Sequence, residues 1–365
     1  MKLRFLRNAA LGIIYAVSTL GIAGTVQAQS FKNIQIPETP LVLKVQGGFF
    51  VGGETVPFTH VELGKFVADG HVTVNQMYVH YMIPETSHGQ YPVVMVHGMA
   101  LTGNSWETTP DGRMGWDEYF VRQGISAFVV DQVGRGRSGF NESVFNNVRE
   151  GLIPPENQTF INRFSDENVW PNFRFGPKIG SPYADTQYPV EAAAEASKQI
   201  VPDLIWGLPN PNPNFKALAD LARDLDGAVL MSHSQSGAYP IEAALIDAAG
   251  IRALVMVEPG GIPRDYTDEQ IKKLASLPVL FVFGDHIGEV PEETGHSWQE
   301  ALNSAEFFVS RINKAGGNAT MLHLPKAGIH GNSHMIMQDK NNSEIADMII
   351  KWMKENIAKN NIAIL

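Results

Sequence analysis

A serine set among small residues is the feature of this chain that most directly suggests chemistry. The run Ser232-His233-Ser234-Gln235-Ser236-Gly237 follows a short apolar segment, and a helix-forming stretch, Ile241 to Ala249, comes after it. A serine between a strand and a helix, with small residues two positions away on either side, is typical of a nucleophile elbow. The usual flanking residue is glycine, and serine is nearly as small. Ser234 is therefore a candidate nucleophile, with an ordinary strand-to-helix turn as the alternative interpretation.

A serine hydroxyl is a weak nucleophile at neutral pH, so it needs a base, and the base needs an acid that orients it. The segment from Gly328 to His334 follows the last apolar run and offers two histidines, His330 and His334. His334 lies where a loop is expected to return over the sheet, whereas His330 lies nearer the strand. The spacing alone does not choose between them.

Two carboxylates are candidates for the acid. Glu258 directly follows the apolar run Ala253 to Val257, and Asp285 follows the next run, Val279 to Phe283. Ligands of open α/β sheets bind outside the carboxyl ends of the strands, so either carboxylate could belong to a site there. The strand end at Asp285 is the commoner place for such an acid. Either carboxylate could instead cap a helix or brace a loop, and both stay candidates.

The run Val96-His97-Gly98-Met99 could supply donors for an oxyanion. It directly follows the apolar strand that begins at Val93. A turn at this point would aim the backbone N–H of Met99 at the same space as that of Gln235, and such donors stabilise the charge that develops in acyl transfer. We expect His97 to brace this loop without reacting.

The rest of the chain predicts strands that alternate with helices. Three stretches rich in β-branched and aromatic residues predict an antiparallel entry to a sheet: Leu41 to Phe50, Thr55 to Leu63 and Val72 to Met82. Short apolar runs then predict buried strands at 93–96, 126–130, 228–231, 253–257, 279–283 and 321–324. Helices are expected between them, including one from Gly112 to Gln123 and a closing helix, Ser343 to Ile357, capped by Ser343. This order indicates an α/β fold with a mainly parallel sheet and helices on both faces.

One region, at about 141–215, interrupts this alternation because it is rich in asparagine, proline and aromatic residues. An irregular insertion of this size commonly covers a site, and we expect a cap. A surface excursion is the alternative. Its aromatic residues could line an apolar acyl or aryl pocket, or could pack the cap onto the domain: Phe160, Phe164, Trp170, Phe173, Phe175 and Trp206.

Composition points to an exported protein. Residues 1–28 have the basic start, the short apolar core and the small-residue cleavage site, near Ala28, of a signal peptide. Cleavage would leave residues 29–365 as the folded domain in the periplasm or outside the cell. An uncleaved signal anchor is the alternative. The 365 residues contain no cysteine, so stability must come from burial. A formal charge of −10 argues against nucleic acid or an anionic membrane surface as a partner. No later stretch is long and apolar enough to span a bilayer.

Four runs carry a family resemblance: Gly47 to Gly53, Thr108 to Phe120, Ser232 to Gly237 and Gly331 to Met335. They resemble a small group of exported bacterial esterases in the α/β-hydrolase superfamily, and the resemblance covers almost all of residues 29–365. It implies an α/β-hydrolase fold.

The resemblance also implies roles for individual residues. Ser234 would be the nucleophile, Glu258 the acid and His334 the base, while Met99 and Gln235 would donate to the oxyanion. This chain has Met99-Ala100 where that group carries adjacent cysteines. Donation by the backbone does not depend on those side chains.

These observations favour a serine carboxylic-ester hydrolase that forms an acyl-enzyme with a small apolar or aryl ester and uses neither a metal nor an organic cofactor. A lactone or amide hydrolase of the same fold is the alternative. A metal-dependent or non-catalytic ligand-binding protein is less favoured, because no metal-ligand spacing links the residues that could form such a site: His97, His233, His330, His334, Asp285 and His286.

Overall fold

The computed structural model describes residues 31–357. The predicted signal peptide, residues 1–28, lies outside the described residues. None of the described helices is long and apolar enough to cross a membrane.

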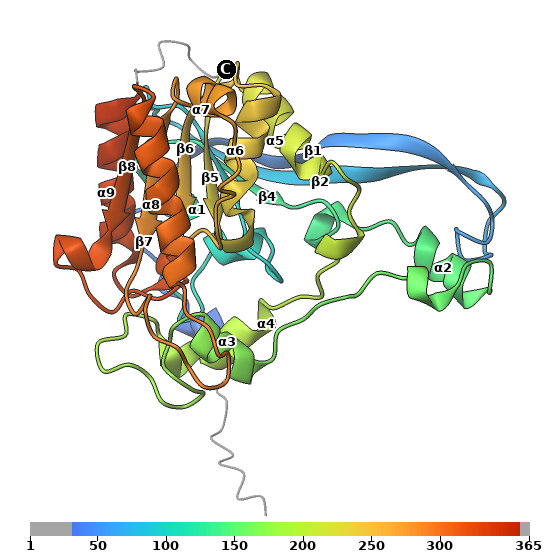
Figure 1. Ribbon diagram of the computed structural model, residues 1–365, viewed down its shortest axis with the longest axis horizontal. Helices are drawn as coiled ribbons and strands as arrows, with labels where there is room; N and C mark the ends of the chain where they lie inside the picture. Colours follow the sequence, from blue (N-terminus) through green and yellow to red (C-terminus); the bar gives the residue numbers. More distant parts are fainter. Residues whose placement is uncertain (1–30, 358–365) are drawn as a thin grey trace, which may run out of the picture.

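The centre of the molecule is a sheet of eight strands in the order β1-β2-β4-β3-β5-β6-β7-β8 (Figure 1). β1 pairs antiparallel with β2, and β2 antiparallel with β4, while the other neighbours are parallel. The predicted mainly parallel sheet is therefore confirmed. The strands are β1 (Leu43–Phe58), β2 (Gly70–Pro84), β3 (Val93–Val96), β4 (Ala127–Asp131), β5 (Ala228–His233), β6 (Ile251–Val257), β7 (Pro278–Phe283) and β8 (Asn318–His323).

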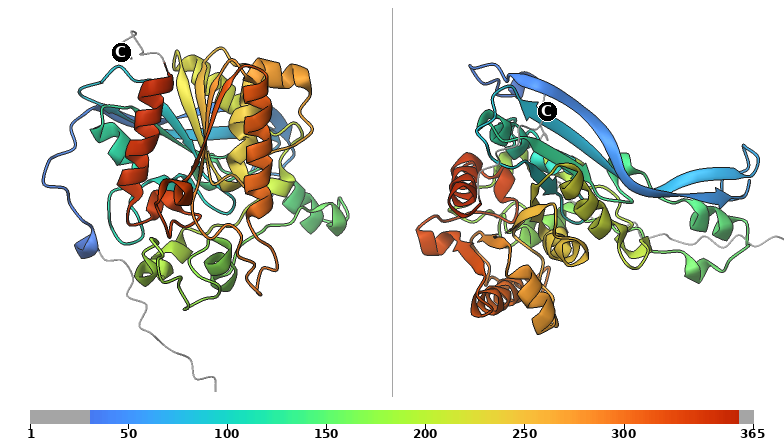
Figure 2. Two further views of the ribbon diagram at one scale, coloured as in Figure 1. Left: turned by 60° about the vertical axis from the view of Figure 1, so that its left-hand side comes forward. Right: turned by 90° about the horizontal axis from the view of Figure 1, so that it is seen from above.

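The antiparallel entry differs from the prediction. The two strands expected at 41–50 and 55–63 are one continuous strand, β1, and residues 59–63 lie in a turn. Gly52 and Gly53 have φ values of 68° and 87°, opposite Asn75 of β2 at 61°, so both strands bend at the same level without ending. The resulting hairpin extends well beyond the body of the molecule (Figures 1 and 2).

Helices cover both faces of the sheet, as predicted. They are α1 (Trp116–Arg122), α2 (Ser143–Arg149), α3 (Asp166–Asn172), α4 (Ala193–Lys198), α5 (Pro213–Asp224), α6 (Tyr239–Ile246), α7 (Asp268–Leu274), α8 (Gln299–Lys314) and α9 (Asn342–Asn356). Short 3₁₀ helices complete the order: η1 (Phe31–Asn33), η2 (Gly103–Trp106), η3 (Gly136–Ser138), η4 (Pro155–Asn157), η5 (Val190–Ala192), η6 (Ile205–Gly207), η7 (Ser234–Ala238), η8 (Leu324–Ala327) and η9 (Ile336–Gln338).

Each face of the sheet has its own hydrophobic core. One core contains residues of α5, α6, α7 and α8, and the other contains residues of α1, α9 and the 141–215 segment. Successive side chains of β3 alternate between the two, because neighbouring residues of a strand point to opposite faces. This double burial explains why β3 is a short, wholly apolar run.

Two helix boundaries differ from the prediction. α1 begins at Trp116, not at Gly112, because Gly112 has a φ of 85° and lies in a turn where its N–H donates to the Thr109 carbonyl. α9 begins at Asn342 with Asn341 as its N-cap, so Ser343 lies inside the first turn and the predicted cap at Ser343 is wrong.

The 141–215 segment divides into two parts in space. α2 lies beside the tip of the β1–β2 hairpin, where Asn146 Nδ2 donates to the Glu62 carbonyl at 2.7 Å (Figure 1). α3 and α4 lie together at one end of the sheet (Figure 1). The last residues of the segment already belong to α5, a helix of the sheet's own covering layer.

Candidate active site

Ser234 lies at a sharp turn between β5 and α6. Its φ is 57°, a left-handed conformation that a non-glycine residue adopts only where its surroundings enforce it. The small residues that follow Ser234 are required for two separate reasons. A Cβ on Gly237 would lie 2.4 Å from Pro259 Cβ, so only glycine fits there. The Ser236 hydroxyl lies 2.9 Å from the His233 carbonyl and 3.2 Å from the Val96 carbonyl, so a serine can replace the usual glycine at this position.

The structure brings Ser234, His334 and Glu258 together. The Nε2 atom of His334 lies 2.8 Å from Ser234 Oγ, and its Nδ1 atom lies 3.1 Å from Glu258 Oε2. His334 and Glu258 are fully buried, whereas Ser234 is half-buried. This is the arrangement of a hydroxyl, a base and an orienting acid.

The alternates Asp285 and His330 pair with each other and not with Ser234. His330 Nδ1 lies 3.0 Å from Asp285 Oδ2, and the His330 side chain is 59% exposed. Asp285 Oδ2 also accepts the Gly331 N–H at 3.1 Å. The pair therefore braces the loop that precedes His334.

The loop that carries His334 is held from several directions. The carboxylate of Asp339 accepts the Ser333 N–H at 2.8 Å, the Ser333 hydroxyl at 2.6 Å and the Asn332 side-chain amide at 2.9 Å. The His334 ring packs against Trp298, with ring centroids 4.1 Å apart and an interplanar angle of 31°. These contacts leave the imidazole one orientation, toward Ser234.

Glu258 is a buried carboxylate that stays ionised. Burial alone would raise its pKa, but the guanidinium of Arg174, with Nη2 at 2.7 Å from Oε1, and the contact with His334 outweigh burial and lower the pKa to about 2. The N–H of Gly284 also donates to Oε1. Oε1 is thus occupied by Gly284 and Arg174, and Oε2 faces His334.

The base is neutral near neutral pH. Burial lowers the pKa of His334 below its usual value near 6.5, and the positive charge of Arg174 lowers it further, while Glu258 acts in the opposite direction. A neutral imidazole can accept a proton from Ser234 Oγ.

The turn from His97 to Met99 packs against the elbow. A Cβ on Gly98 would lie 2.8 Å from Ser234 Cβ, so the two backbones approach very closely. Met99 and Gln235 line the same cavity as Ser234. Among the described residues the Met99 N–H donates to no protein acceptor, and Gln235 lies in the first turn of η7, where amides have no partner within the helix.

His97 braces this turn, as predicted. Its Nδ1 atom lies 2.9 Å from the Gly98 carbonyl, and its Nε2 accepts the Gln132 N–H at 3.0 Å. Burial, followed by the charge of Arg135, lowers the pKa of His97 to about 3, so its ring is neutral.

A cavity of about 680 Å³ opens at Ser234. Two of the six aromatic residues singled out in the sequence, Phe164 and Phe173, line it, while Trp170 and Phe175 are buried in the core and Phe160 and Trp206 are exposed. The other apolar walls come from the domain itself: Met99, Leu101, Ile262, Trp298 and Ala301. At the rim, Arg264 and Glu300 form an ion pair at 2.6 Å.

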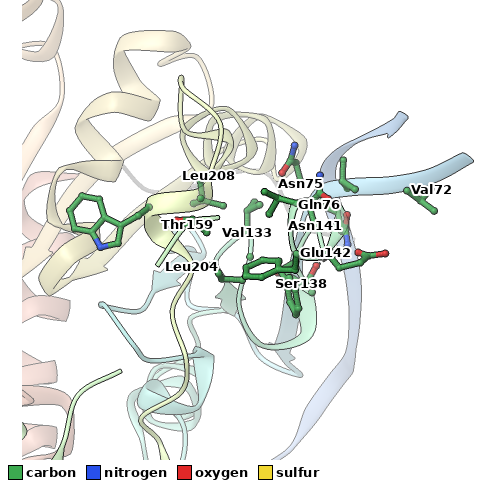
Figure 3. Close-up of a pocket in the computed structure, with 18 of the residues that line it drawn as sticks. Val72, Asn75, Gln76, Val133, Ser138, Asn141, Glu142, Thr159, Leu204 and Leu208 are labelled. Carbon is green, nitrogen blue, oxygen red and sulfur yellow. Dashed lines mark hydrogen bonds between the residues drawn. The ribbon is translucent and has the colours of Figure 1, made fainter. Parts of the chain in front are cut away.

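A second cavity, of about 440 Å³, lies elsewhere, between β2, the loop after β4 and the 141–215 segment (Figure 3). Its walls include Gln76, Ser138, Thr159 and Leu204. It contains none of the candidate catalytic residues, and we assign it no chemistry.

Of the histidines and acids considered for a metal site, Asp285 and His286 lie close together, with Asp185 beside them. Both ring nitrogens of His97 and of His334 already have the partners given above. Within residues 31–357, one group of three could hold a cation, namely Asp185, Asp285 and His286. Its His286 Nε2 lies 2.9 Å from Asp185 Oδ1.

Sequence reasoning missed Arg174 and Asp203, both in the 141–215 segment. Arg174 is paired with Glu258, and the Asp203 carboxylate accepts the Ala100 N–H at 2.7 Å and pairs with Arg135 at 2.8 Å. Neither residue lies in a motif or beside a predicted strand end, so the sequence carried no signal for them. Asp339 lies only five positions beyond His334 in the chain, and this closeness was a usable signal.

Comparison with known proteins supplies two informative matches. A solved structure described as a novel bacterial esterase is 48% identical, with a TM-score of 0.83 and coverage of 89% of this chain and 99% of that chain. A fungal protein (Fungal sp., strain ATCC 74256) named Probable secreted lipase phiG is 24% identical, in an alignment that covers 86% of this chain and 90% of that protein. None of the family models compared with the chain matches it.

Proposed function

Because the chain belongs to the α/β-hydrolase superfamily, in the family of the bacterial esterase described above, and is a hydrolase of the esterase and lipase type, we propose that it is a serine carboxylic-ester hydrolase that forms an acyl-enzyme. The observation that carries the proposal is the continuous contact from Ser234 Oγ through the His334 ring to Glu258, at 2.8 Å and 3.1 Å.

In the first half of the proposed reaction, Ser234 Oγ attacks the ester carbonyl while His334 Nε2 takes its proton. The backbone N–H groups of Met99 and Gln235 receive the charge that develops on the carbonyl oxygen. His334 then returns the proton to the leaving alcohol, and the acyl group stays on Ser234. In the second half, His334 activates a water molecule, which releases the acid and frees Ser234.

Glu258 is the proposed acid because its Oε2 faces His334 Nδ1. A carboxylate at this position fixes the tautomer that leaves Nε2 free to accept a proton, and it stabilises the imidazolium that forms. Asp285 is occupied by His330 and Gly331 and cannot serve His334 in this arrangement. The proposed mechanism draws on no metal or organic cofactor.

The cavity supports a neutral, apolar ester as the substrate class. Its walls are mainly apolar. At its rim, Arg264 and Glu300 neutralise each other's charge. A charged acyl group would lose its hydration here without gaining a free partner of opposite sign. A small ester with an alkyl or aryl group would bury that group against Phe164, Phe173 and Trp298.

We also propose that the protein is exported, with cleavage of the signal peptide near Ala28. The composition of residues 1–28 supports this proposal, and so does the printed name of the fungal relative.

Replacement of the nucleophile tests the proposed function. We expect Ser234→Ala to lower kcat for short p-nitrophenyl esters by about 10⁴-fold or more, since loss of a catalytic serine in related chemistry removes nearly all of the rate enhancement. The variant should keep the melting temperature of the wild type, and only the wild type should be labelled by a fluorophosphonate.

Ser310→Ala, at an exposed serine of α8, is the matched control and should retain full activity. Substantial ester hydrolysis by the Ser234 variant would contradict the proposal. A lactone and an amide of matching size, assayed beside the ester, separate the two alternative activities of this fold.

A further inference from the structure

Three consecutive residues at the end of α3 each bind a different part of the candidate active site. The Asn172 carbonyl accepts the Trp298 Nε1–H at 2.8 Å, and the Phe173 carbonyl accepts the His334 N–H at 2.8 Å. Arg174 Nη2 lies 2.7 Å from Glu258 Oε1. The cavity wall, the base and the acid are thus all contacted by one short piece of the 141–215 segment.

The backbone at Arg174 is shaped to turn its side chain inward. Arg174 has a φ of 58°, and its N–H donates to the Pro171 carbonyl at 3.1 Å as the chain leaves α3. A left-handed arginine is held only where the surrounding structure determines it. Here the side chain is 2% exposed, its Nε donates to the Asp285 carbonyl at 2.8 Å, and its guanidinium lies 5.6 Å from the Trp298 ring centre.

We propose that Arg174 is a positioning residue that holds the Glu258 carboxylate in the orientation His334 requires, so that the 141–215 segment completes the active site as well as covering it. The inference rests on the proposed function, because it assigns Arg174 a role in the same reaction.

The arrangement of the carboxylate shows why an arginine is needed. Oε2 faces His334 Nδ1, and the groups that contact Oε1 oppose rotation of the carboxylate away from it. The Gly284 N–H contributes one contact there and Arg174 contributes the other. Without Arg174, the buried Glu258 anion would keep the Gly284 N–H on Oε1 but would lose the counter-charge that holds it in place.

The charge of Arg174 also bears on the base. The polar and titratable groups near the His334 ring are Glu258, Arg174, Ser234 and His233, whose Nε2 atom lies 2.8 Å from the His334 carbonyl. Burial keeps the pKa of His233 well below its usual value, so its ring is neutral. Arg174 is the cation in this set that opposes protonation of His334. Glu258 favours protonation of His334 by more than Arg174 opposes it, so a variant that releases the Glu258 carboxylate from His334 should lower the pKa of His334.

The test compares Arg174→Met and Arg174→Lys with the wild type in ester hydrolysis. In the wild type we expect the acidic limb of kcat/KM to lie below pH 6.5. In Arg174→Met the limb should move to lower pH and kcat should fall by about 10²-fold, with KM changed far less, because a displaced carboxylate neither orients the base nor favours its protonation. Arg174→Lys keeps the charge but loses the rigid fork, so kcat should fall while the limb stays near its wild-type position.

A double variant, Arg174→Met with Glu258→Gln, tests whether Arg174 acts through Glu258. We expect the loss in kcat from Arg174→Met to vanish largely in the Glu258→Gln background, because the group being positioned is already gone. Arg163→Met, at an exposed arginine of the same segment, is the matched control and should leave kcat and the pH profile unchanged.

The outcomes separate this inference from the proposed function. If Arg174→Met melts at a lower temperature but keeps the wild-type kcat and pH profile, Arg174 is merely structural and the inference is wrong. The same holds if the effects of the two substitutions simply add in the double variant. If hydrolysis proves independent of Ser234, the proposed function itself fails.

Discussion

Two carboxylates at neighbouring strand ends have opposite environments. Glu258 is fully buried, paired with Arg174 and directed at His334, whereas Asp285 is partly exposed and paired with His330. In both groups burial acts to raise the pKa, and hydrogen bonds and neighbouring charges act to lower it. The ionisation state therefore does not distinguish the two carboxylates. They differ in the side chains that they contact.

Parallel substitution of the two acids tests this difference. Glu258→Gln should lower kcat by about 10³- to 10⁴-fold, because the neutral amide neither fixes the His334 tautomer nor stabilises the imidazolium. Asp285→Asn should change kcat only a few-fold, since the backbone carbonyl that Arg174 binds is unaltered. Steady-state kinetics on one ester measure both variants.

The free energy of unfolding of Glu258→Gln gives a second test. Glu258→Gln leaves the buried Arg174 without its counter-charge, so the free energy of unfolding should fall by about 3–5 kcal/mol. A larger loss of kcat in Asp285→Asn than in Glu258→Gln would mean that the acid has been wrongly assigned.

Among the elements, the contact between the turn after β3 and the elbow after β5 sets the position of the oxyanion donors. These two strands are parallel neighbours, so their carboxyl ends bring Gly98 and Ser234 together. There is no room for a side chain between them, because a Cβ on Gly98 would also lie 2.9 Å from His233 Nδ1.

Gly98→Ala should therefore damage catalysis more than folding. The added methyl group must push the turn away from the elbow, which moves the Met99 N–H out of line with that of Gln235, and kcat should fall by about 10- to 100-fold. KM should change little, because the apolar walls of the cavity are unaffected.

Gly288→Ala is the matched control for this prediction. A Cβ there would meet its nearest neighbour, Gln299 Oε1, at 3.8 Å, which is an ordinary contact. Wild-type kcat in Gly98→Ala would show that the turn does not supply an oxyanion donor.

Across the whole molecule, the 141–215 segment is anchored on both sides of the candidate site. Residues 172–174 bind the side of Glu258 and His334, and Asp203 binds the side of the turn after β3, where Arg135 Nη1 also donates to the Gly98 carbonyl at 2.8 Å. The Val201 N–H donates to the Ala100 carbonyl at 2.8 Å. The segment and the sheet therefore form one structure around Ser234.

Asp203→Ala should destabilise the fold strongly. It removes the counter-charge of Arg135, which is 3% exposed, and leaves the Ala100 N–H unpaired, so the free energy of unfolding should fall by about 3–5 kcal/mol. Urea denaturation followed by circular dichroism measures the change.

Asp220→Ala provides the comparison, because Asp220 pairs with the largely exposed Lys216 and Arg223 and should cost no more than about 1 kcal/mol. Equal losses in the two variants would contradict an anchoring role for Asp203.

The sequence by itself determined the architecture and the nucleophile candidate. Periodicity identified the buried parallel strands, because a strand covered on both faces must be wholly apolar, and small residues around Ser234 marked the turn. Those signals are local. Such signals gave a wrong prediction at Gly52 and Gly53, because paired glycines can either end a strand or bend it. Here they bend β1 without ending it.

Only the tertiary structure decided which groups meet. From the residues alone, His330 and His334 were nearly equivalent, and Asp285 stood at the commoner place for the acid, whereas the family resemblance implied Glu258 and His334. The choice depends on bonds between distant segments, such as that from the His334 N–H to the Phe173 carbonyl and that from Arg174 to Glu258. Such pairs leave no periodic pattern in a sequence, because each forms once, where packing happens to bring two segments together.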